Sequence, residues 1–348
     1  MKIFKYIVII LVLLAVFLSV YIATGKSTFE LNVSKQTELS EQRLFRYVNN
    51  LQNFKEWNPW NNNESAFQAD SVAQGSGAKV YWTGDSAMIA EALPNDTIFL
   101  KLHIDGGDYD TKMSFDKKDG KTRLNWNVKG HLSFAEKVQL FFKGTPETLI
   151  APAFEKGLNA IVHHISESID NFSIKSENLT FFKETIYIRQ TVESDIESLG
   201  DKIFQSIEHM NNFARNFELE PYGSPFTVFE NINLQSGNVK YAVCMPIKNF
   251  FSTAAGSDVV CEQIAAFHGY KVVLNGDYIH SDKAWKEAKK QVALKHLTER
   301  TDIKPIAIYK NSILDTQKSE DWVTEFIIPV NETVIPIIEE ETETVEAE

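Results

Sequence analysis

An uninterrupted apolar run opens the hydrophobic pattern of the chain. Residues 7–23 carry no charged side chain and are mostly Ile, Leu, Val and Phe, after Lys2 and Lys5. A run of this length is close to the shortest that crosses a bilayer as a helix. Cleavage of a signal peptide after Ala23 would place Tyr21 where a small residue is preferred. The pattern therefore predicts an uncleaved transmembrane anchor over residues 1–26, and a cleaved signal peptide is the alternative.

The charges around this run bear on its orientation. Lys2 and Lys5 favour a cytoplasmic N-terminus, which would place the rest of the chain on the extracytoplasmic (periplasmic) side. Lys26, Lys35 and Arg43 follow the run and weaken that preference. We predict a single-pass membrane protein with extracytoplasmic soluble domains.

The next region, residues 27–174, changes its hydrophobic period along its length. Alternation at 29–33 predicts a strand, and apolar residues at helical spacing over 44–51 predict a helix with Ser40 as its N-cap. Several strand-like runs separated by Gly, Asn and Asp turns then extend to about residue 130. A long apolar stripe over 158–172 indicates a closing helix. The pattern predicts an α+β domain with an antiparallel sheet.

A second domain is predicted over residues 184–331, after a short linker at 175–183. Strand, helix, strand and strand follow one another, and the order then repeats. Ser194 and Glu197 have the spacing of a capping box for the first helix, and Ser281 precedes the second helix. The closing runs are "PIAIYK" and "WVTEFIIPV". The sequence thus predicts a duplicated α+β unit.

Composition adds limits to this organisation. A chain of 348 residues with 43% hydrophobic residues can form two cores. Its net charge is −12, but residues 332–348 contain seven Glu and no Lys or Arg, and without them the charge is about −5. We predict that this acidic tail is disordered. Nothing in the charge pattern favours nucleic acid, which requires clustered Lys and Arg.

The cysteines and histidines suggest no metal or cofactor. Cys244 and Cys261 have no C-x-x-C spacing, and either one disulfide or two free thiols fits the sequence. His163 and His164 are adjacent, but further ligands at metal-binding spacing are missing from the sequence. We predict neither a metal nor a cofactor.

Residues 29–173 resemble the START-like superfamily, which includes the polyketide cyclases and is also called SRPBCC. The resemblance is carried by "LFRYVNNLQNFKEWNPW", the Gly75 and Gly77 pair, "WTG" at 82–84 and "FEKGLNAI". It implies a helix-grip fold, in which the sheet wraps around the last helix and encloses a deep apolar cavity. By the same resemblance the residues lining that cavity are Trp57, Trp60, Trp82 and Trp126. Ordinary core packing is the alternative role for large aromatic residues.

Residues 180–331 resemble the GyrI-like effector-binding domain of multidrug-sensing regulators. "PYGSPFTVFENIN", "VVLNGDYIHSDKAW" and the closing run carry the resemblance. It implies that Glu325 serves a cationic, often aromatic ligand. The matching wall residues are Tyr278 and Tyr309, with Trp285 and Trp322 as weaker candidates. Strand alternation places Glu325 on one face with Val323 and Ile327. Asp277 stands in a segment where family members often have Gly-Pro-Tyr, so the mouth of the pocket differs.

Together these patterns predict a membrane-anchored protein that senses, sequesters or transfers a hydrophobic or cationic small molecule. Motifs such as G-x-S-x-G and H-E-x-x-H are missing from the sequence. An alternative is a hydrolase or cyclase-like enzyme in which Glu325 acts as general base beside Tyr278. A protein-interaction module without a ligand is the third possibility. The sequence leaves the question of enzymatic activity, the protein partners and the oligomeric state open.

Overall fold

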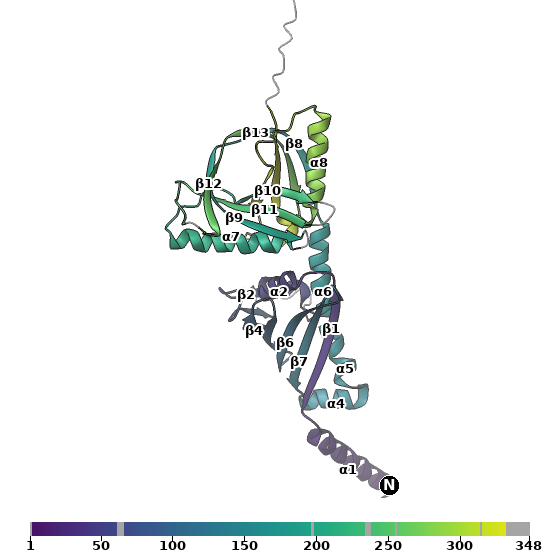
Figure 1. Ribbon diagram of the computed structural model, residues 1–348. Coiled ribbons are helices and arrows are strands. Elements are labelled where there is room, and N and C mark those ends of the chain that lie inside the picture. The colour runs from purple at the N-terminus through teal and green to yellow at the C-terminus, as the bar shows by residue number, and fades with distance from the viewer. Residues whose placement is uncertain are drawn as a thin grey trace, which may run out of the picture. The chain divides into compact units, whose positions relative to one another are not determined.

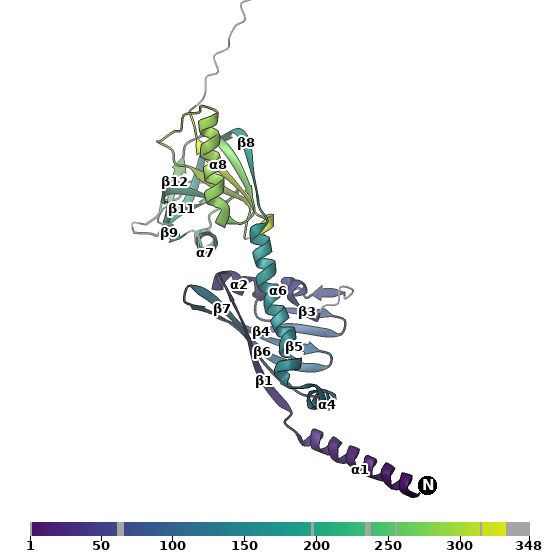
Figure 2. The same ribbon diagram turned by 90° about the vertical axis from the view of Figure 1, so that its right-hand side faces the viewer.

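The computed structural model describes residues 2–60, 66–195, 198–233, 238–254, 256–313 and 315–331. The chain divides into two units, Met1–Ser168 and Ile169–Glu348, and each has its own antiparallel sheet (Figures 1 and 2). The protein is therefore an α+β protein. The acidic segment 332–348, which we predicted to be disordered, lies outside the described residues.

The apolar run at the N-terminus forms one helix, α1 (Lys2–Thr24). Within its segment Ile3–Thr24, a stretch of 18 residues has a mean hydropathy of 3.0, and only 6% of that stretch is buried. At 1.5 Å per residue the 22 residues extend about 33 Å, enough for the hydrocarbon core of a bilayer. An anchor and a signal sequence both have these properties.

Unit 1 is built on a sheet that, in its described residues, has seven strands in the order β1-β7-β6-β5-β4-β3-β2. The strands are β1 (Thr28–Thr37), β2 (Phe67–Ala69), β3 (Lys79–Trp82), β4 (Asp85–Leu93), β5 (Thr97–Ile104), β6 (Gly107–Lys118) and β7 (Lys121–His131). Its other helices are α2 (Glu41–Asn49), α3 (Phe54–Trp57), α4 (Phe134–Lys143), α5 (Pro146–Leu149) and α6 (Ala151–Asp170), with a 3₁₀ turn at Leu51–Asn53.

Local sequence signals explain how these elements begin and pack. The Ser40 hydroxyl accepts a hydrogen bond from the Arg43 backbone at 3.3 Å, so the predicted N-cap is confirmed. In α6 the buried side chains recur at helical spacing, and Gly157 is so close to Trp126 that an added Cβ would lie 2.9 Å from its ring. Phe154 contacts the same ring at 4.8 Å. The core of unit 1 therefore lies between α6 and the sheet.

Unit 2 contains an eight-stranded sheet in the part of the chain that the structure describes. Its strands are β8 (Ser173–Phe182), β9 (Thr185–Asp195), β10 (Phe226–Asn233), β11 (Asn238–Pro246), β12 (Val259–Ile264), β13 (Phe267–Asn275), β14 (Ile306–Asn311) and β15 (Val323–Pro329). Its long helices are α7 (Leu199–Asn216) and α8 (Ser281–Leu294), and 3₁₀ turns cover Tyr278–His280 and Ser319–Asp321.

Two local expectations differ from the structure of unit 2. Residues 175–183 were expected to be a linker, but most of them belong to β8, which pairs with β13 at the edge of the sheet. The helix α7 begins at Leu199, whereas Ser194 lies in β9 and its hydroxyl is 3.2 Å from the Tyr241 hydroxyl. Glu197 is outside the described residues. Strand pairing and a tyrosine partner therefore determine the conformation at Ser194.

The predicted duplication is visible in the strand order β12-β9-β11-β10-β14-β15-β13-β8. The series β9, α7, β10, β11 is repeated as β13, α8, β14, β15, and the two halves meet where β10 pairs with β14. A rotation of 180° about an axis through the central Thr227–Ala307 pair, perpendicular to the sheet, superimposes one half on the other. In this superposition Arg189 takes the position of Lys271. The aligned rows are Phe226–Cys244–Arg189 in one half and Ile306–Ile327–Lys271 in the other.

The two faces of this sheet differ in what covers them. Both α7, which packs on β9 and β11, and α8, which packs on β13 and β15, lie on one face (Figure 1). We call the opposite face the inner face, defined by seven buried residues: Tyr187, Phe226, Ala242, Cys244, Phe267, Ile306 and Ile327. Cys244 is among them, whereas Cys261 packs on the helix side, and both thiols are free. The disulfide left open by the sequence is therefore not formed.

Candidate ligand-binding face

The inner face has an apolar floor formed by strands from both halves of unit 2. Tyr187 packs edge-on against Phe226 with ring centroids 5.2 Å apart, and Phe182 stacks on Phe267 at the same distance. Gly269 allows close approach in β13, because a Cβ there would lie 2.4 Å from a methyl group of Ile327. Two charged clusters border this floor.

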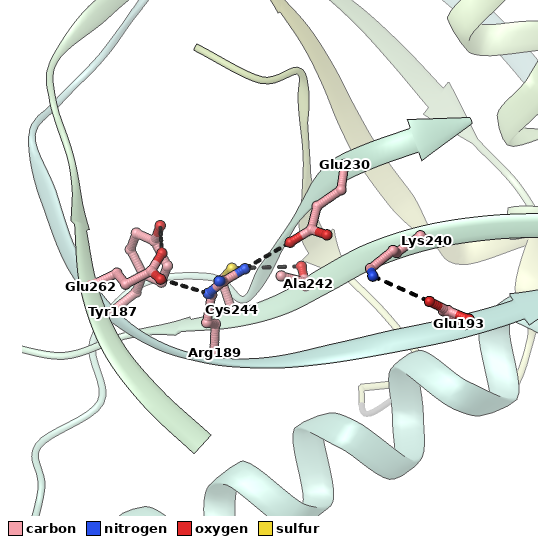
Figure 3. Close-up of polar contacts among 8 residues, drawn as sticks. All are labelled: Tyr187, Arg189, Glu193, Glu230, Lys240, Ala242, Cys244 and Glu262. Atoms are coloured by element: carbon pink, nitrogen blue, oxygen red, sulfur yellow. Dashed lines mark hydrogen bonds and ion pairs between the residues drawn. The ribbon is translucent and has the colours of Figure 1, made fainter. Parts of the chain in front are cut away.

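The first cluster centres on Arg189 (Figure 3). Its Nη1 donates to Glu230 Oε1 at 2.9 Å, and its Nε lies 3.0 Å from Glu262 Oε1. The Tyr187 hydroxyl donates to the other oxygen of Glu262 at 3.2 Å. Glu230 sits at a bulge in β10, between Phe229 and Asn231 in the register. One cation thus faces two carboxylates, which leaves an excess of one negative charge.

Burial and charge act in opposite directions on this cluster. Burial lowers the pKa of Arg189, but the hydrogen bond that Arg189 donates to Glu230 and the charges of Glu262 and Glu230 outweigh it, and the pKa is raised. Burial also raises the pKa of Tyr187, and the neighbouring Cys244 and Glu262 raise it further. Burial raises the pKa of the Cys244 thiol as well. Arg189 is therefore charged, and the tyrosine and the thiol are neutral, at physiological pH.

The second cluster centres on Lys271, the counterpart of Arg189. Lys271 Nζ lies 2.7 Å from Glu177 Oε2 and donates to Glu325 Oε1 at 3.3 Å. The side chains of Lys271 and Glu325 are 19% and 20% exposed. Burial lowers the pKa of Lys271, but the hydrogen bond to Glu177 and the charge of Glu325 outweigh it, and the pKa is raised. This cluster also has one negative charge in excess.

The structure confirms the predicted face of Glu325 but separates it from its predicted aromatic neighbours. Glu325 pairs with Ile308 and Val273 on the inner face. The four predicted wall residues belong to the core on the helix side of the sheet: Tyr278, Tyr309, Trp285 and Trp322. The expectation that they surround Glu325 is therefore corrected. The physical reason is strand alternation, because Tyr309 pairs with Thr324, one position before Glu325.

On the helix side these aromatics are packed against one another. Tyr278 stacks on Trp322 with centroids 4.5 Å apart, and Trp285 contacts Phe326 edge-on at 4.8 Å. The Tyr309 hydroxyl lies 3.0 Å from the Thr227 hydroxyl, and burial raises its pKa well above the usual value. Their contacts are those of a packed core.

The tryptophans predicted to line a cavity in unit 1 lie in one aromatic cluster. Trp57 and Trp126 meet edge-on at 5.6 Å, Trp82 reaches them through Phe54, and Trp60 is partly buried. The indole Nε1 atoms of Trp57, Trp82 and Trp126 are buried and have no hydrogen-bond partner among the described residues. An unsatisfied buried donor costs about 1–3 kcal/mol. That these residues line a ligand cavity stays a prediction.

Five charged residues of the inner face were not predicted from the sequence: Glu177, Arg189, Glu230, Glu262 and Lys271. A signal for two of them was present. In the strand-like run "TIYIRQTV", Arg189 is two residues after Tyr187 and so lies on the same face of the strand. Lys271 interrupts the apolar run "YKVVL". The carboxylates gave no such signal, because their strand pairing was needed to bring them to these cations. Within the described ranges, no three His, Cys, Asp or Glu side chains form a group that could hold a metal ion.

Comparisons with known proteins give only distant similarities. No family model matches the chain, and no curated protein matches it. The chain is similar in part to the C-terminal domain of EcmrR, with 17% identity over 46% of this chain and 98% of that domain and a TM-score of 0.38. SA2116 of Staphylococcus aureus is 12% identical over 41% of this chain and 96% of its own, with a TM-score of 0.34. CV1439 of Chromobacterium violaceum is 13% identical over 38% of this chain and 94% of its own, with a TM-score of 0.30.

Proposed function

We propose that this protein binds an apolar cationic small molecule on the inner face of unit 2, while α1 anchors it in a membrane. One observation carries the proposal. The apolar floor of the inner face is bordered by two clusters, and each contains one cation and two carboxylates. An apolar surface with a local excess of negative charge is complementary to a ligand that is itself apolar and positively charged.

Two terms favour such a ligand. Covering apolar surface contributes about 25 cal/mol for each Å² removed from water. Glu325 Oε1 accepts a hydrogen bond from Lys271. Among the described residues its Oε2 has no partner, so this oxygen is available to a ligand cation. The attraction between this carboxylate and a ligand cation is electrostatic, and it is stronger beside an apolar floor than in bulk water, so the ligand needs no hydrogen-bond donor. The floor would therefore supply affinity and the carboxylate selectivity for cations.

The spacing of the clusters limits the size of the ligand. Arg189 in β9 and Lys271 in β13 are five strand positions apart, about 24 Å along the curved sheet. A compact monocation contacts one cluster at a time. An elongated molecule with a cationic group at each end is the form that would use both.

The membrane part of the proposal concerns α1. As a single-pass anchor with Lys2 and Lys5 in the cytoplasm, it would place both units on the extracytoplasmic side. The intact mass of the protein purified from membranes tests whether α1 is retained, because cleavage after residue 23 would remove the anchor.

Calorimetric titration of the full chain in lipid nanodiscs tests the ligand site, with tetraphenylphosphonium as the probe. Glu325→Gln keeps the shape of the side chain and removes its charge. We expect a loss of about tenfold in affinity, which corresponds to ~1.4 kcal/mol. The matched control is Glu208→Gln on the exposed side of α7, which should bind like the unmodified chain. Equal affinities for both variants and the unmodified chain would reject Glu325 as a ligand residue.

A second variant determines the sign of the ligand charge. Lys271→Met removes the cation that competes for Glu325 and Glu177, so it should strengthen binding of tetraphenylphosphonium. An anionic probe of similar shape, tetraphenylborate, should gain nothing. The opposite order would show that the inner face selects anions. If neither probe binds, the protein-interaction alternative gains support.

The enzyme alternative requires Glu325 and Tyr278 to act on one substrate. They lie on opposite faces of the sheet, and Tyr278 is packed against Trp322. Lys271 also neutralises part of the charge that a general base would need. The geometry therefore favours binding over the predicted acid-base pair.

A further inference from the structure

The helix α4 is formed by strong local signals, yet none of its residues is buried in the described chain. A capping box joins Ser133 and Glu136 at its start, and Gly144 follows its end. Its aromatic side chains are largely in contact with solvent: Phe134 is 51% exposed, Phe141 49% and Phe142 68%. A stable helix that exposes a cluster of large apolar side chains indicates an interaction surface.

These phenylalanines share one side of α4. At 100° per residue, Phe134 and Phe141 lie within about 20° of each other around the helix axis, and Phe142 is about 80° further round. Glu136 lies on the other side, where its Oε1 accepts a hydrogen bond from the Tyr109 hydroxyl of β6 at 3.3 Å. The polar side of α4 thus faces the sheet of unit 1, and the aromatic side faces away from it.

The same helix is attached to the end of α1. Lys137 Nζ donates to the carbonyl oxygens of Ala23 at 3.0 Å and Gly25 at 2.9 Å, and to Ser27 Oγ at 2.8 Å. Phe141 contacts the ring of Tyr21 edge-on, with centroids 6.2 Å apart. Both views show the end of α1 beside α4 (Figures 1 and 2). Lys137 therefore satisfies carbonyls that the end of a helix leaves unpaired.

We propose that α4 is an interfacial membrane helix, whose Phe134, Phe141 and Phe142 side chains insert into the boundary between the lipid headgroups and the acyl chains. The occupant of this surface is the bilayer that α1 enters. If α1 spans the hydrocarbon core, Tyr21 and Ala23 lie at its boundary, and the contacts of Lys137 and Phe141 hold α4 at the same depth.

The composition of α4 fits that position. Phe is one of the residues typical of the apolar face of an interfacial helix. Tyr concentrates at membrane boundaries, and Tyr21 supplies such a ring beside Phe141. Lys137 and Lys143 provide positive charge at the level of the headgroups. A helix lying in the interface would fix the base of unit 1 against the membrane at a second point beside α1.

Site-directed spin labelling of the full chain in lipid nanodiscs tests the proposal. The label is placed at Phe142→Cys in a chain that also carries Cys261→Ser, while Cys244 is fully buried and stays unlabelled. Two reference labels are Leu13→Cys in the middle of α1 and Phe217→Cys after α7, where the phenylalanine is exposed. Collisions with oxygen report contact with lipid, and collisions with a neutral nickel chelate report contact with water.

We expect the label at 142 to be severalfold more accessible to oxygen, relative to the nickel chelate, than the label at 217, and shallower than the label at 13. A label at Phe134→Cys should give the same result, which protects the test against a local effect of one substitution. Thermal unfolding of each labelled chain checks the fold. If the label at 13 is in lipid while those at 134 and 142 are as accessible to water as the label at 217, the proposal is wrong. This outcome is independent of ligand binding in unit 2.

Discussion

The two halves of unit 2 place a cation at the same position but hold it differently. Arg189 binds two carboxylates with a rigid planar group, and Tyr187 holds one of them from the other side. Lys271, its counterpart, shares a single ammonium group between Glu177 and Glu325. A flexible point charge gives up a carboxylate more readily than a guanidinium bound to two partners. If the inner face binds a ligand as proposed, this difference predicts a structural role for the first cluster and ligand exchange at the second.

The largest expected effect separates the clusters by stability. Arg189→Met leaves Glu230 and Glu262 without their cation in a half-buried site, and we expect the free energy of unfolding to fall by about 2–3 kcal/mol. Lys271→Met should cost less, about 1 kcal/mol, because a single ammonium group holds two carboxylates less firmly than the planar guanidinium of Arg189 does. Urea unfolding of the two variants measures both values. Equal losses would remove the distinction between the clusters.

The next effect separates the clusters by ligand affinity. Glu325→Gln should lower the affinity for tetraphenylphosphonium about tenfold, as above, while Glu230→Gln should lower it only about twofold, since Arg189 occupies Glu230. The titrations use the same nanodisc preparation. A larger loss in Glu230→Gln would move the ligand to the Arg189 cluster.

A third test concerns the helix side of the sheet. Tyr309→Phe removes the hydrogen bond to Thr227 and leaves that buried hydroxyl unpaired, so we expect a loss of about 1 kcal/mol in unfolding free energy. Ligand affinity should be unchanged, because Tyr309 and Glu325 lie on opposite faces. Chemical unfolding and calorimetry give the two readouts. If Tyr309→Phe bound the ligand more weakly and its unfolding free energy were unchanged, Tyr309 would be a ligand-binding residue.

The smallest effect appears at alkaline pH. The pKa of Lys271 is raised in the folded protein, so its stabilisation is complete below the unfolded pKa of about 10.4 and is lost as pH rises through the folded value. Lys271→Arg stays charged and should lose a few tenths of a kcal/mol less between pH 9 and about 11. The control is Lys286→Arg, because the Lys286 side chain is exposed and pairs with Asp282 on the same helix. Identical pH profiles for the two variants would contradict the shifted pKa.

Much of the fold could be predicted because it depends on local patterns. The duplicated element order, the N-cap at Ser40 and the orientation of Glu325 all follow from capping and from strand alternation over a few residues. The partners of Glu325 could not be predicted, because they depend on pairing between distant strands. Glu177 belongs to a segment expected to be a linker, and Tyr309 is placed by its register with Thr324. Register across a sheet is a property of the assembled core.

The positions of the two cysteines in unit 2 mean that a disulfide between them would report whether the sheet is folded. Cys244 and Cys261 are in strands separated by β9, and their side chains lie on opposite faces. A disulfide requires Cα atoms within about 7 Å and Cβ atoms directed at each other, so the folded sheet keeps these thiols apart. In an oxidising compartment, a bond between them would form only in chains whose sheet had opened. Such a bond would mark a molecule that had lost its native state, and it would also prevent that molecule from regaining it.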